Sequence, residues 1–107
     1  MRSTLGEVLG GLDKFDWKQW VYILRGDGIS AATSCIVLDP DAAELGLDDF
    51  TPVEVESAGM EEFLSVHDLM AIQKNLNMWQ SEPPLSEKCR ASVYYFENDA
   101  FMPKTNE

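Results

Sequence analysis

The chain has 107 residues and a net charge of −11, from 19 acidic and 8 basic side chains. This length fits one domain. The hydrophobic content of 45%, which includes three tryptophans, supplies material for a packed core and argues against an intrinsically disordered chain. The acidity argues against direct binding to nucleic acid or to an anionic membrane, because both surfaces are negatively charged.

The first predicted element is a helix over residues 3–13. Ser3 or Thr4 can cap its start, and Glu7 lies in its first turn. Leucines and a valine recur at helical spacing and form one apolar stripe. Three glycines weaken this helix, since each costs about 1 kcal/mol relative to alanine in a helix interior.

Two strands are predicted next, over residues 20–24 and 33–38. The first is rich in aromatic and branched side chains, and the second has the sequence TSCIVL. Between them, RGDGIS supplies two glycines and an aspartate for a turn. Strand, glycine-rich turn and strand predict an antiparallel pair with a loose connecting loop.

The pattern over residues 40–59 is ambiguous because apolar stripes are short there. Thr51-Pro52-Val53-Glu54 is typical of a helix start, with proline at the first helical position, and Gly59 would end that short helix. Residues 62–65 are predicted to form a short strand.

Two longer helices complete the chain. Ser65 is the predicted cap of a helix that runs to about Gln80, and a second helix opens at Leu85 after two prolines. Residues 102–107 are expected to be a frayed tail. The sequence therefore predicts an α+β domain spanning residues 1–107, in which a small antiparallel sheet of two to three strands packs against about four helices.

The N-terminal residues lack the apolar stretch of a secretory signal, and no run approaches the roughly 18 apolar residues of a transmembrane helix. We therefore expect a cytoplasmic protein with no membrane association. Cys35 and Cys89 are 54 positions apart without a CxxC motif. In a reducing compartment they are expected to be buried free thiols.

The sequence offers no convincing catalytic or metal-binding set. His67, the single histidine, lies at a predicted helix start, and Cys35 lies between apolar neighbours in a predicted strand. Asp39, Asp41 and Glu44 resemble the start of a calcium loop, but the glycine and glutamate that an EF-hand requires are missing. We therefore expect no enzymatic activity, no metal and no cofactor.

The charge is concentrated in one segment. Residues 26–73 contain 11 acids and no lysine or arginine, whereas the rest of the chain holds 8 of each sign. This segment is either a solvated face that keeps the protein soluble or an interface for a cationic partner. Apolar residues between the acids favour the interface. The candidate contacts are Asp39, Asp41, Asp48, Asp49, Glu54, Glu56, Glu61 and Glu62, with Phe50 or Met60 as a central apolar anchor.

The C-terminal sequence SVYYFENDAF, residues 92–101, follows a Pro-Pro-Leu-Ser turn. It resembles small bacterial proteins that include immunity proteins of contact-dependent growth inhibition systems. The resemblance implies a cytosolic protein that binds the C-terminal toxin domain of a delivered effector. Many such toxins are basic nucleases, often cleaving transfer RNA. The tyrosines and phenylalanines of this motif are expected to pack in the core rather than to contact a partner.

The leading hypothesis is therefore an immunity protein that neutralises a basic toxin, with a nuclease as the favoured class, by protein–protein association. A nuclease cleft carries lysine and arginine to hold phosphates, and carboxylates can pair with the same groups. One alternative is a nucleic-acid mimic, or another acidic regulatory binding protein, that acts on a protein unrelated to toxins. Another is a small enzyme that uses His67 or Cys35.

Overall fold

The computed structural model describes residues 2–24, 26, 28–46 and 51–103. Its centre is an antiparallel sheet with the strand order β1-β3-β2-β4, so the second and third strands along the chain are the inner ones. This architecture confirms the predicted α+β class, with a fourth strand beyond the two to three expected. The strands are β1 (Arg2–Thr4), β2 (Trp20–Ile23), β3 (Ser34–Leu38) and β4 (Glu61–Ser65).

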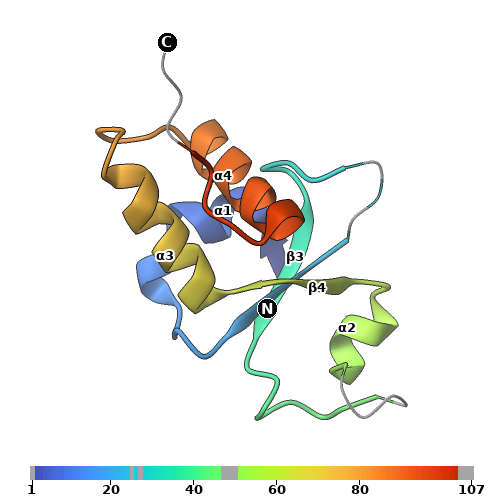
Figure 1. Cartoon of the computed structure of the whole chain (residues 1–107). Helices are drawn as coiled ribbons and strands as arrows, with labels where there is room; N and C mark the ends of the chain where they lie inside the picture. Colours follow the sequence, from blue (N-terminus) through green and yellow to red (C-terminus); the bar gives the residue numbers. More distant parts are fainter. Residues whose placement is uncertain (1, 25, 27, 47–50, 104–107) are drawn as a thin grey trace.

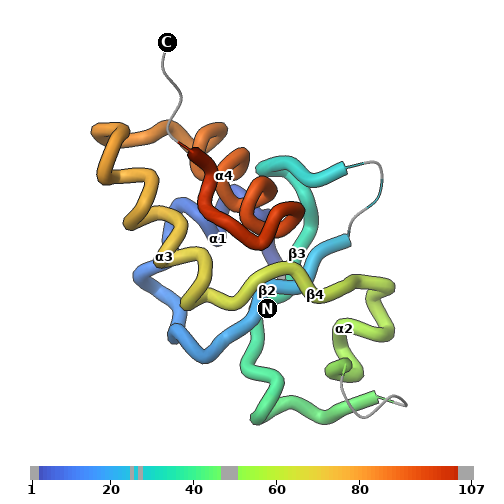
Figure 2. Tube along the Cα trace, in the orientation of Figure 1, coloured from blue at the N-terminus to red at the C-terminus, as the bar shows by residue number. Residues whose placement is uncertain are grey.

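The helices divide unequally between the two faces of the sheet. Helices α1, α3 and α4 gather on one face, and the short helix α2 lies on the other, as Figure 1 shows. Figure 2 shows the chain crossing from one layer to the other through the strands. The bounds are α1 (Leu5–Gly10), the 3-10 helix η1 (Leu12–Lys14), α2 (Val53–Ser57), α3 (Val66–Asn77) and α4 (Leu85–Asn98).

Alternation along the inner strands creates two cores. Val21 and Ile23 of β2 belong to the large core beneath α1, α3 and α4, whereas Tyr22 between them belongs to the small core beneath α2. Because neighbouring residues of a strand point to opposite faces, one strand can serve both cores. Tyr22 is paired with Ile36 of β3, which also lies in the small core.

The predicted helix over residues 3–13 is wrong in its extent. Residues 2–4 form strand β1, and the α-helix ends at Gly10 before the separate 3-10 turn. Thr4 caps the helix by accepting a hydrogen bond from the Glu7 N–H at 3.3 Å, and the Glu7 carboxylate accepts one from the Thr4 N–H at 3.1 Å. Successive glycines at positions 10 and 11 explain the early end, because glycine disfavours continued helix.

Met102, the first residue of the expected frayed tail, is packed against the rest of the protein. Met102 is 6% exposed and belongs to the large core, so the expected frayed tail cannot begin at residue 102. Asp99 adopts a left-handed conformation and its N–H donates to the Tyr95 carbonyl at 2.7 Å, which ends α4 and turns the chain back over the helices. Burial of the Met102 side chain then holds this return. Residues 104–107 lie outside the described residues.

Candidate functional site

The acidic segment folds into one lobe on the α2 side of the sheet. We call residues 39–46 and 51–62 the acidic lobe. It leaves the end of β3, passes through α2 and returns as β4, and Figure 1 shows it in green on the side away from the other helices. The described acids of this lobe therefore share one region of the molecule, although they come from a turn, a helix and a strand.

Hydrogen bonds donated by backbone N–H groups fix the shape of the lobe. The Asp39 carboxylate accepts a hydrogen bond from the Asp41 N–H at 2.9 Å, and the Asp39 carbonyl accepts one from the Ala42 N–H at 3.1 Å. Further along, the Val53 N–H donates to the Glu44 carbonyl at 2.8 Å. These bonds make a turn after β3 and join the two arms of the lobe, so its carboxylates are presented from an ordered backbone.

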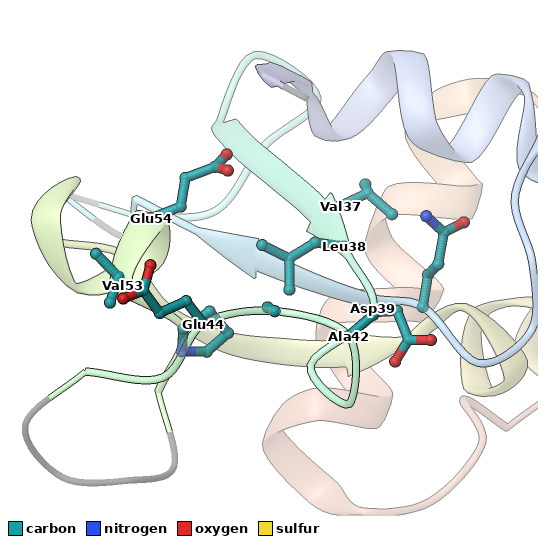
Figure 3. Close-up of a pocket in the computed structure, with 10 residues that line it drawn as sticks. Val37, Leu38, Asp39, Ala42, Glu44, Val53 and Glu54 are labelled. Atoms are coloured by element: carbon teal, nitrogen blue, oxygen red, sulfur yellow. The ribbon is translucent and has the colours of Figure 1, made fainter.

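A hollow of about 540 Å³ opens between the turn after β3 and the start of α2. Carboxylates of Asp39, Glu44 and Glu54 lie around it, with the Leu38 side chain between them in Figure 3. The hollow thus combines an apolar centre with negatively charged surroundings. We call it the acidic hollow; its lining consists of Gln19, Val37, Leu38, Asp39, Ala42, Ala43, Glu44, Pro52, Val53 and Glu54.

The other described candidate contacts do not line this hollow. Asp41, Glu61 and Glu62 are exposed. Glu56 is exposed too, but its carboxylate lies against the backbone of Gly46, where a larger residue would displace it. The three remaining candidates, Asp48, Asp49 and Phe50, lie outside the described residues.

Met60, which the sequence offers as an apolar anchor for an interface, lies in the small core and not at the surface. Met60 is 7% exposed and packs in the small core with Tyr22, Ile36 and Val55. Its position follows from the left-handed turn at Gly59, which ends the α2 region and turns the chain inward to start β4. Val53 is a better apolar contact, because it is 39% exposed and lines the acidic hollow.

Two acids of the lobe affect the pKa of Tyr22, a residue of strand β2. Burial first, and then the negative charges of Glu62 and Asp39, together raise the pKa of Tyr22 to about 12. Burial and negative charge both disfavour the phenolate. The negative field of the lobe therefore reaches the small core.

A second hollow, of about 460 Å³, lies on the other side of the turn after β3. Its lining is aromatic and polar, and Trp17 is 57% exposed there, so the expectation that all tryptophans supply the core is wrong for this one. A sequence signal was present, since Trp17 stands between the charged residues Asp16 and Lys18. We call this the aromatic hollow; it is lined by Trp17, Lys18, Trp20, Asp41, Ser65 and His67.

Comparison with known proteins assigns a family. Residues 2–104 match a family described as a domain of unknown function, DUF7716. The chain belongs to the DUF7716 family. No curated protein matches the chain, and no solved structure matches it.

In this DUF7716 domain the two candidate catalytic residues differ in exposure, since Cys35 is buried and His67 lies at the surface. Cys35 is fully buried, and burial raises the pKa of its thiol, which disfavours the reactive thiolate. His67 is 70% exposed, and its Nδ1 lies 4.0 Å from the nearest Asp68 carboxylate oxygen. Within the described part of the DUF7716 domain, no three potential metal ligands come together. None of the described helices has the length and apolar character of a membrane span.

Proposed function

We propose that this protein is a binding protein of the immunity type, which neutralises a basic toxin domain by stoichiometric association in the cytoplasm. In this proposal the acidic lobe meets the cationic surface of the toxin, most simply a nuclease. The protein needs no cofactor and catalyses no reaction. Inhibition follows because the toxin's basic groups are engaged and its substrate is kept away.

The acidic hollow is the observation that supports the proposal best. A solvated face needs only charge, whereas this hollow is lined both by the exposed apolar side chain of Val53 and by three acidic residues. An apolar centre with a polar rim is the usual composition of a protein–protein interface. The carboxylates add electrostatic attraction, which speeds encounter with a cationic partner and rejects anionic ones.

Charge separation along the chain also supports the proposal. The acids of the lobe come from a segment without lysine or arginine, so the lobe contributes acidic side chains and no lysine or arginine to a contact surface. Keeping so many like charges together opposes folding through their repulsion. A cationic partner would relieve that repulsion, which gives the association a favourable electrostatic contribution.

The test uses the toxin domain encoded by the gene directly upstream, because immunity genes follow their toxin genes. Its complex with this protein is measured by calorimetry at low and high salt. The double variant Asp39→Asn/Glu44→Gln removes two charges from the acidic hollow, and asparagine still accepts the turn hydrogen bond at position 39. We expect affinity to fall at least about tenfold at low salt, with a weaker dependence on salt.

A matched control separates local contact from total charge. Asp13→Asn/Glu97→Gln removes the same charge from two exposed positions outside the acidic lobe. This control should bind almost as tightly as the wild type. Equal losses in the two double variants would contradict a role for the acidic hollow. An upstream gene that encodes no toxin would favour an acidic regulator of another protein.

A further inference from the structure

The aromatic hollow has a composition that the proposed electrostatic contact does not require. It brings an exposed indole, a second and partly buried indole, an imidazole and a carboxylate to one concave site. Tryptophan is enriched among the interface residues that dominate binding energy.

The ring of Trp17 is already arranged for contact with a cation. The Lys18 ammonium lies 5.6 Å from the centre of this ring, on its face. The imidazole of His67 meets the ring at an interplanar angle of 69°, with the ring centres 6.2 Å apart. The imidazole thus supports the orientation of the indole, and the exposed ring presents a negative π-face to a positive group.

Asp41 supplies the charge that a bound cation needs. It is exposed, it lines the aromatic hollow, and its backbone N–H is held by the Asp39 carboxylate at 2.9 Å. The same turn therefore serves both sites, with Asp39 and Ala42 on the acidic hollow and Asp41 on the aromatic hollow. One partner surface can contact both hollows at once.

We propose that the aromatic hollow binds an arginine side chain of a cationic partner. The flat guanidinium stacks on the Trp17 indole in place of the exposed Lys18 ammonium, and its N–H groups donate to the Asp41 carboxylate. Arginine suits this site better than lysine, because a guanidinium is planar, weakly hydrated and able to stack while it forms paired hydrogen bonds. This inference rests on the proposed function, since it specifies how the acidic surface recognises its basic partner.

The test compares two probes of equal charge, hexa-arginine and hexa-lysine peptides, each titrated into the full chain by calorimetry at low salt. We expect the wild type to bind hexa-arginine about three- to fivefold more tightly than hexa-lysine. In Trp17→Leu the ratio of the two affinities should fall to near one, because hexa-arginine binding weakens while hexa-lysine binding is almost unchanged. Asp41→Asn should weaken both peptides, hexa-arginine more.

Control variants distinguish the specific loss of Trp17 or Asp41 from the loss of any aromatic ring, of any acidic charge, or of the fold. Phe101→Leu removes an aromatic ring that is 44% exposed elsewhere, and Asp13→Asn removes an exposed acid outside the lobe; both should keep the preference for arginine. Circular dichroism checks that every variant is folded. A preference that survives Trp17→Leu, or is absent from the wild type, overturns the arginine site alone. If neither peptide binds the wild type, the cationic-partner proposal fails as well.

Discussion

Phe63 and Leu64 are consecutive residues of β4, yet both side chains enter the large core. Leu64 is paired with Val21 of β2, and Glu62 is paired with the next residue, Tyr22, so Phe63 is an extra residue in the strand. This is a β-bulge, which breaks the usual alternation of faces. The Phe63 ring lies 4.9 Å from that of Phe96, and the bulge thereby joins β4 to α4.

The bulge predicts a large stability loss when the Phe63 ring is removed. Phe63→Ala should lower the free energy of unfolding by about 3–5 kcal/mol, because the ring is 3% exposed and its loss leaves a cavity beside Phe96. Phe63→Leu should lose less. Urea denaturation measures both. Met78→Ala is the control, since Met78 is 79% exposed and should change stability by no more than about 0.5 kcal/mol. Similar values for Phe63→Ala and the control would contradict the bulge packing.

The cap at Thr4 predicts a smaller effect. Thr4→Ala removes the hydroxyl that accepts from the Glu7 N–H, and it should cost about 1 kcal/mol of unfolding free energy. Thr4→Ser keeps that acceptor and should cost clearly less. Thermal denaturation of the three proteins gives the comparison. The capping explanation is wrong if serine and alanine destabilise the protein equally.

The raised pKa of Tyr22 predicts a loss of stability in alkali. Below pH 10 the phenol is neutral in both states and contributes nothing to the pH dependence. Between pH 10 and the folded pKa of about 12, only the unfolded chain releases the proton, so unfolding becomes more favourable as pH rises. The loss due to Tyr22 should reach up to about 3 kcal/mol.

Tyr22→Phe supplies the comparison for this prediction. The variant should lack the part of the alkaline loss that Tyr22 causes, and its absorbance titration should lack the tyrosine that ionises last. In Glu62→Gln the pKa of Tyr22 should fall only partly, because burial is the larger cause of the shift. Parallel stability curves for wild type and Tyr22→Phe from pH 9 to 12 would show that Tyr22 is not perturbed.

Two glycines predict opposite effects of the same substitution. A Cβ would meet nothing within 4 Å at Gly10 or at Gly59, but only Gly59 has a positive φ, of 68°. Gly59→Ala should destabilise the protein by about 1 kcal/mol, because alanine is strained in that region. Gly10→Ala should stabilise it by about 0.5 kcal/mol, since alanine favours the end of α1. Denaturation midpoints measured side by side decide this, and a shift of the same sign in both variants would contradict it.

The candidate site was predictable in part. The grouping of acids followed from the sequence, since an uninterrupted acidic segment that returns from β3 to β4 must occupy one region. The presence of two separate hollows could not be predicted from the sequence. The turn at Asp39 and the position of Trp17 beside it depend on contacts between distant segments. For the same reason the sequence could not show that Met60 is buried and Val53 exposed.

The sequence by itself determined the α+β class, the pair of strands that became β2 and β3, and the helices that became α3 and α4. Helical spacing of apolar residues, caps and prolines act over a few positions, so they can be recognised along the chain. Only the tertiary structure decided that residues 2–4 pair with β3, that β4 carries a bulge at Phe63, and that Trp17 stays at the surface. These features depend on which distant segments meet, and burial against a partner segment outweighs the weak local preferences of short strands and single residues.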